Sequence, residues 1–153
     1  MTSLYDTDFY AWAHEQAALL RDGAWQALDV GHLAEELALL AEGELGQLVN
    51  RLIILLTHLL KLQVAAQHLP MDLRRAGLGW RQTCQTQRVR LAQVLRRNPS
   101  LQPRLARAID DAYDVALLEA AYGLGLAALP MPAACPLKGT QVLDQNFWPE
   151  VTT

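Results

Sequence analysis

The most continuous hydrophobic pattern in the chain runs from Leu45 to Leu69, in the segment LGQLVNRLIILLTHLLKLQVAAQHL. Leucine, isoleucine and valine fall on nearly every side of a helix built from it, which is typical of a helix at the centre of a fold. One stripe of this axial helix is polar, because its members recur at spacings of three, four and seven: Gln47, Asn50, Arg51, Thr57, His58, Lys61 and His68. A buried basic stripe needs partners, so we expect carboxylates to pair with Arg51 and Lys61.

Helical spacing also predicts two helices before the axial one. The first is capped by Asp6 or Thr7, carries its apolar face from Phe9 to Leu20, and ends at Gly23. The second begins near Val30 after the capping residue Asp29, with Leu33, Leu37 and Leu40 as its apolar face. Gly43 and Gly46 then predict a break, rather than a kink, before the axial helix.

The axial helix should end near His68, because Pro70 disfavours helix in the residue before it. A loop at 73–79 leads to a fourth helix, Trp80 to Arg97, with a turn at 98–100. Ser100 is the expected cap of a fifth helix that fades at Gly123 and Gly125. The tail from Pro130 is expected to be irregular, with a short helix near 140–144 and with Phe147 and Trp148 anchoring it on the bundle.

These elements predict an all-α fold. No stretch alternates with period two, so no sheet is expected. The length of 153 residues suits one domain with a sizeable core. We therefore predict a single domain over 1–153, a bundle of about five helices around the central apolar helix, with residues 130–153 forming an irregular tail docked on the bundle.

Composition narrows the class of protein further. Apolar residues make up 52% and charged residues 19%, which is a globular composition. The N-terminus has neither a basic start nor an apolar segment, so we expect no signal peptide. The apolar run Leu52 to Leu60 is shorter than the roughly 20 residues that span a bilayer. These features predict a cytoplasmic protein without membrane association. Cys84 and Cys135 form neither a disulfide framework nor a paired metal motif.

The net charge of −3 is unevenly spread. Nine arginines and no acid lie from Arg74 to Arg107, whereas nine carboxylates and one arginine precede residue 51. Either the two halves pair inside the fold, or the basic segment faces an outside anion. The candidate anion or nucleic-acid ligands are Arg81, Arg88, Arg90 and Arg97. They flank the inner face on both sides and lack interleaved aromatics apart from Trp80, so we favour internal pairing over nucleic-acid binding.

The candidate residues for catalysis or metal binding centre on His58. The candidate catalytic residues are His58, Lys61, Glu35 and Glu36, and the candidate metal ligands are His32, Glu36 and His58. His32 and Glu36 are four apart and share one side of a helix, a spacing that can hold a divalent metal. Neither the E-x-x-H pairs of di-iron bundles nor H-E-x-x-H is present.

For these residues a structural interpretation competes with the chemical one. Glu35 and Glu36 would pair with Arg51, Lys61 or Arg88. We favour a structural His58 that is neutral, inaccessible and hydrogen-bonded to a neighbouring helix or to backbone.

Six segments carry a resemblance to a known family: YDTDFYAWAHEQAALLR, LDVGHLAEELALL, LLTHLLKLQ, WRQTCQTQRVRLAQVLRRNPSL, AIDDAYDVALLEAA and CPLKGTQVLDQNFWP. In this order and spacing they resemble the bacterial "domain of unknown function 29" family, whose members look all-helical and have no established activity. The resemblance marks these positions as family-like: Asp8, Trp12, Glu35, Glu36, His58, Lys61, Trp80, Thr83, Gln87, Arg88, Tyr113, Phe147 and Pro149. The chain departs from the family at Gly43, Gly46, Leu62 and Thr86, which removes a carboxylate and some aromatic surface.

Together these patterns favour a non-enzymatic protein-interaction or scaffold module that acts through a helix face. We expect a homo-oligomer, with a further protein partner of unknown identity and with no cofactor. Two alternatives stay open: a metal-binding protein or enzyme centred on His58 with Glu35 and Glu36, and an anion or nucleic-acid binder that uses Arg74 to Arg107.

Overall fold

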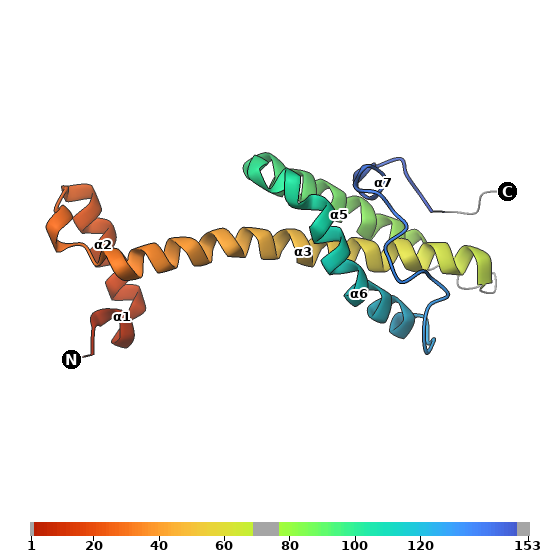
Figure 1. Cartoon of the computed structure of the whole chain (residues 1–153), viewed down its shortest axis with the longest axis horizontal. Helices are drawn as coiled ribbons and strands as arrows, with labels where there is room; N and C mark the ends of the chain where they lie inside the picture. Colours follow the sequence, from red (N-terminus) through yellow and green to blue (C-terminus); the bar gives the residue numbers. More distant parts are fainter. Residues whose placement is uncertain (1, 69–76, 150–153) are drawn as a thin grey trace. The chain divides into compact units, whose positions relative to one another are not determined.

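The computed structural model describes residues 2–68 and 77–149 (Figure 1). Every regular element within these ranges is helical and none is a strand, so the predicted all-α class is confirmed. Most of the loop predicted at 73–79 lies outside the described residues. The chain groups into two compact units, residues 1–43 and 44–153, here called the N-terminal and C-terminal units. The single domain over 1–153 stays a prediction, and each unit is described by itself.

The N-terminal unit contains two capped helices and a turn. Helix α1 spans Leu4–Thr7, α2 spans Phe9–Asp22, and a 3-10 turn, η1, spans Trp25–Ala27. Asp8 caps α2 by accepting the Ala11 N–H at 2.9 Å, so neither predicted cap, Asp6 or Thr7, is the cap of this helix. Gly23 ends α2 as predicted, because its φ of 69° lies in the left-handed region that glycine adopts without a steric penalty.

Aromatic packing holds the N-terminal unit together. The ring of Tyr5 stacks on His32 with the centroids 3.8 Å apart. Trp12 is buried and donates from Nε1 to Asp29 Oδ2 at 3.2 Å. Asp29 also caps the next helix, as predicted, by accepting the His32 backbone N–H. This carboxylate therefore fixes the start of the long helix against α2.

That long helix, α3, spans Val30–His68 without interruption. The break predicted at Gly43 and Gly46 is wrong. A helical glycine costs only about 1 kcal/mol relative to alanine, and no residue beside these two offers a competing turn or cap. The flanking leucines, alanines and glutamates favour helix strongly enough to carry it through. Neither glycine touches another element, because a Cβ at either position would meet nothing within 4 Å.

The C-terminal unit is built around the second half of α3. Helix α5 spans Gly77–Arg97, the 3-10 segment η2 spans Pro99–Arg104, and α6 spans Leu105–Gly123 (Figure 1). The core residues without exposed surface on α3 are Leu48, Leu52, Leu55, Leu56, Leu59 and Leu60. Cys84, Leu91 and Val94 from α5 and Tyr113 and Ala116 from α6 belong to the same cluster. Burial raises the pKa of the Cys84 thiol to about 12, which is the behaviour of a small buried hydrophobic residue.

The C-terminal tail docks on this unit, as predicted. It contains the short helix α7, Gly139–Leu143, and its Val142 and Trp148 join the core. Arg88 on α5 holds the tail. Its side chain is 1% exposed, donates from Nε to the Val142 carbonyl at 2.8 Å and from Nη2 to the Phe147 carbonyl at 2.9 Å, and stacks 5.0 Å from the Trp148 ring.

The structure therefore corrects two expectations for Arg88. Its guanidinium is committed to backbone carbonyls inside the fold, so it is not available to an outside anion. It also does not pair with Glu35 or Glu36. Backbone carbonyls, rather than carboxylates, accept hydrogen bonds from Nε and Nη2 of the buried cation, while its Nη1 has no partner among the described residues. The sequence does not indicate which acceptors a buried arginine will meet.

Helix α3 also changes the argument about membranes. The stretch Val30–Gln67 is long and apolar enough to cross a bilayer by length and composition, and 56% of its most apolar window is buried inside the fold. The core helix of a soluble protein passes the same test. The short run Leu52 to Leu60 is therefore no longer an argument against a membrane, and the cytoplasmic location stays a prediction.

Replacing Arg88 with methionine should lower the free energy of unfolding by about 3 kcal/mol. The variant keeps the apolar stem but leaves the carbonyls of Val142 and Phe147 without their buried donor, at about 1–3 kcal/mol each. The matched control is Arg90→Met on the exposed side of the same helix, which should change stability by less than about 0.5 kcal/mol. Urea denaturation followed by circular dichroism measures both. Equal losses for the two variants would contradict this account of the tail.

Candidate functional site

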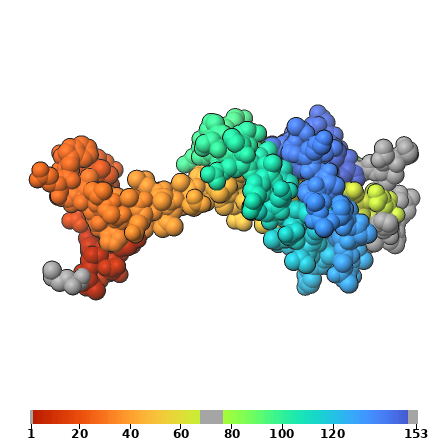
Figure 2. Space-filling view, viewed as in Figure 1, coloured from red at the N-terminus to blue at the C-terminus, as the bar shows by residue number. Residues whose placement is uncertain are grey.

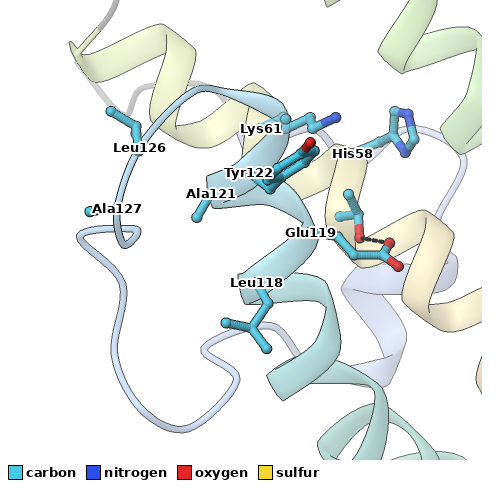
Figure 3. A pocket seen from close by; sticks show the side chains of 10 residues that line it. His58, Lys61, Leu118, Glu119, Ala121, Tyr122, Leu126 and Ala127 are labelled. Carbon is cyan, nitrogen blue, oxygen red and sulfur yellow. Dashed lines mark hydrogen bonds between the residues drawn. The ribbon is translucent and has the colours of Figure 1, made fainter.

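Three residues of the polar stripe of α3, Thr57, His58 and Lys61, line a pocket in the C-terminal unit (Figure 3). The pocket has a volume of about 770 Å³ and lies between α3 and the last turns of α6 with the segment that follows. Its polar lining consists of Thr57, His58, Lys61, Glu119 and Tyr122, and its apolar lining of Leu118, Ala121, Leu126 and Ala127. Two of the predicted candidates on α3, His58 and Lys61, therefore reach the same pocket.

His58 is half-buried and lines this open pocket, so the prediction that it is inaccessible is wrong. Its Nδ1 lies 2.8 Å from the carbonyl oxygen of Ile54, one turn earlier. A carbonyl only accepts, so Nδ1 carries the proton and Nε2 is left as an acceptor in the neutral ring. Burial lowers the pKa of His58, and the charge of Lys61 lowers it further. The partner is backbone, which is one of the alternatives the sequence allowed.

Lys61 meets no carboxylate in the part of the chain that the structure describes. Its Nζ lies 5.8 Å from the centroid of the Trp80 ring. The amine also rests against Gly123, where an added Cβ would collide with Nζ and Cε. Gly123 is the last residue of α6, so the cation sits at the negative end of that helix dipole. The ammonium is thus held in place by a helix end and an aromatic ring.

Glu119 is the carboxylate of the pocket, and it accepts a long hydrogen bond of 3.4 Å from the Thr57 hydroxyl. Arg51 likewise has no carboxylate partner among residues 2–68 and 77–149, and its Nε is buried without a hydrogen bond. The predicted pairing of the basic stripe with acids is therefore wrong for both cations. Charge asymmetry along a sequence does not fix which side chains meet.

The other predicted candidates lie in the N-terminal unit. Glu36 accepts the Tyr5 hydroxyl at 2.6 Å, and this hydrogen bond is the main reason why the pKa of Tyr5 rises to about 12. His32 donates from Nδ1 to Asp29 at 2.7 Å, and Glu35 is exposed. The structural pairing of Glu35 and Glu36 with Arg51 or Lys61 is wrong. Within the described ranges no three histidine, cysteine or acidic side chains gather to hold a metal ion, so His32, Glu36 and His58 form no joint site.

The remaining anion candidates have unlike environments. Arg81 stacks 4.8 Å from the Trp148 ring beside Arg88. Arg97 is exposed and lies 3.9 Å from Glu44, and Arg90 is exposed. An ion pair at 3.9 Å with one partner in solvent contributes little to stability. The arginine segment thus divides into tail-holding and solvent-facing members rather than presenting one ligand cluster.

Sequence reasoning missed Glu119 and Tyr122. Glu119 is the one acid between Asp114 and Asp144, and Tyr122 follows it by three residues. On a helix this spacing places both side chains on the same side. The available signal was an isolated acid in the apolar last part of this helix, VALLEAAYG. Its role becomes clear only once the structure shows Lys61 lining the same pocket.

The fold and the pocket define an all-helical protein with a long central helix and a partly polar cavity at the end of α6. A family model described as "Domain of unknown function DUF29" matches residues 4–148. The chain therefore belongs to this family, as the resemblance implied. No curated protein and no solved structure shows significant similarity to the chain.

The environments of two histidines predict opposite titrations. The hydrogen bond to Asp29 raises the pKa of His32, whereas burial lowers the pKa of His58. In an NMR titration of the ring protons, His32 should gain its proton above the ordinary pKa of about 6.5 and His58 below it.

By linkage, the contribution of His58 to stability is present above about pH 6.5 and is lost as the pH falls through its folded pKa. The variants His32→Gln and His58→Gln assign the two resonances. A pKa for His58 above that of His32 would contradict the assignment of their environments.

Proposed function

We propose that this protein is a non-enzymatic assembly module that self-associates through an uncovered part of α3. The observation that carries the proposal is one row of apolar positions along this helix, here called the apolar stripe. Its ten members recur at spacings of three or four and therefore share one side of the helix: Val30, Ala34, Leu37, Ala41, Leu45, Leu48, Leu52, Leu55, Leu59 and Leu62.

The two ends of the apolar stripe have opposite surroundings. From Leu48 to Leu62 its members are buried in the core of the C-terminal unit. In the N-terminal unit Val30 is 64% exposed and Leu37 is 65% exposed, and Ala34 and Ala41 are exposed too. Within the N-terminal unit, the orange part of α3 forms open surface on the face that Figure 2 shows. Contiguous exposed apolar surface of this kind is typical of a protein-interaction site.

The N-terminal unit does not use this side of α3 for its own packing. Helix α1 contacts α3 through Tyr5, which touches His32 and Glu36. Those two positions lie four residues apart, on a different side of the helix from Leu37. The unit is therefore held together without the exposed half of the apolar stripe, which is left free for another chain.

Charge complementarity favours a second copy of this chain as the occupant. Residues 1–43 contain eight carboxylates and one arginine, a net charge of −7. Residues 44–153 contain twelve basic and eight acidic residues, a net charge of +4. The N-terminal unit of one copy is thus attracted to the C-terminal unit of another, while the apolar stripe supplies the contact. A dimer that joins an acidic unit to a basic unit around an apolar contact should bind less tightly as the salt concentration rises.

Replacing Leu37 with glutamine should weaken self-association at least about tenfold, because the apolar contact of each copy loses about 1.5–3 kcal/mol. The matched control is Leu39→Gln. Leu39 is 62% exposed, but it projects to the opposite side of α3. Sedimentation equilibrium of the full chain gives the dissociation constant of wild type and both variants.

Three outcomes would overturn the proposal: a wild type that is monomeric at all accessible concentrations, equal weakening by both substitutions, or dimerisation that is insensitive to salt between about 0.05 and 0.5 M. The proposal would also be contradicted if the protein bound lipid vesicles and the dimer was lost, because a membrane would then cover the apolar stripe.

A further inference from the structure

The pocket at the end of α6 has a charge arrangement that the assembly proposal does not use. It combines one cation, Lys61, with one carboxylate, Glu119, and with a ring that burial keeps neutral, His58. Lys61 forms no ion pair with any carboxylate in residues 2–68 or 77–149. Figure 3 shows Lys61, Tyr122, His58 and Glu119 at the centre and right of the view, with Leu126 and Ala127 at the left and Leu118 below.

From this juxtaposition we propose that the pocket binds a small organic monocarboxylate, with its carboxylate on Lys61 and its apolar body against the end of α6. The site is independent of self-association and involves no reaction. A charge-assisted hydrogen bond from the lysine ammonium is the contact that fixes the orientation of the ligand.

The position of Lys61 is built rather than incidental. Its amine rests on Gly123, where any side chain would take its place, and the Trp80 ring lies on another side of it. Long lysine side chains lose rotamer freedom when they bind, so one that is already confined binds an anion with a smaller entropic penalty. Glycine at position 123 thus leaves the space that the ammonium occupies.

The charges indicate an anion with one negative charge. Any anion in this pocket meets one cation, Lys61, and one carboxylate, Glu119, so the second negative charge of a phosphate dianion would have no cation to balance it. The neutral His58 adds no second positive charge and presents Nε2 as an acceptor, because Nδ1 donates to Ile54. A carboxylate balanced by Lys61 alone fits this set of groups, and the Tyr122 hydroxyl adds a further donor.

The remaining lining indicates an apolar body. Leu118, Ala121, Leu126 and Ala127 contribute no polar side-chain atoms, and the ring of Tyr122, on a residue that is 90% exposed, borders the opening. A volume of about 770 Å³ lies within the range of small-molecule pockets. Short alkanoic and aromatic acids have this combination of one charged end and one apolar end.

The test titrates the full chain with hexanoate and, separately, with the uncharged hexanamide, followed by two-dimensional NMR. Hexanoate should shift the resonances of His58 and of residues 118–127, and it should bind at least about tenfold more tightly than the amide. Lys61→Gln should abolish this preference. Lys138→Gln is the matched control, because Lys138 is the other lysine of the chain, is exposed, and does not line the pocket.

A second variant moves the cation without removing it. Gly123→Ala places a methyl group where the Lys61 amine lies, and a flexible lysine end can yield without disturbing the fold. Hexanoate binding should weaken several-fold in this variant while its circular dichroism spectrum stays that of the wild type. Equal affinity for acid and amide, equal losses in the two lysine variants, or no shifts at millimolar hexanoate would each overturn the proposal.

Discussion

Burial of the apolar stripe of α3 is the constraint on which the structure depends. Leucines on this helix are each worth about 1.5–3 kcal/mol when they leave water, and those from Leu48 to Leu60 in the core have no exposed surface. Helices α5 and α6 supply the apolar faces that cover them, and the tail supplies Val142 and Trp148. The same stripe continues to Val30 without this cover. The buried half of the apolar stripe therefore accounts for the fold of the C-terminal unit, and its exposed half is the basis of the proposed assembly.

Three polar side chains near the core meet the backbone rather than carboxylates. Arg88 donates to the carbonyls of the tail, His58 to the carbonyl of Ile54, and the Lys61 ammonium rests at the end of α6. Backbone carbonyls lose less on desolvation than carboxylates do, so a buried cation is accommodated without burying a second charge. The carboxylates of the N-terminal unit consequently remain outside the core, where they contribute to its negative field.

Much of the fold followed from periodicity, because amphipathic spacing reports directly on which side of a helix is buried. The axial helix, the buried face of α5 with Cys84 and Leu91, and the docked tail with Trp148 were all predicted. The break predicted at Gly43 and Gly46 was wrong, because the low helix propensity of glycine is a weak effect beside the helix-forming residues around it. The pairing of Arg88 could not be read from the sequence at all, since its acceptors are main-chain atoms 53 and more residues away.

The candidate site was half predictable for the same reason. His58 and Lys61 share a polar stripe on one helix, so their proximity is a local property. Glu119 and Tyr122 reach the pocket only through the packing of α6 on α3. The pairing of Tyr5 with Glu36 depends in the same way on how α1 packs against α3, and no charge pattern indicated it.

Hydrogen–deuterium exchange at two protein concentrations tests most directly whether a second copy covers the apolar stripe. Exposed helix amides exchange by local opening, and a docked partner slows that opening. Between about 1 µM and about 100 µM, peptides covering Val30 to Ala41 should become protected, while peptides covering Leu52 to Leu60 should be equally protected at both concentrations. Protection of Val30 to Ala41 that does not change with concentration, in a protein whose mass stays that of one chain, would contradict the account.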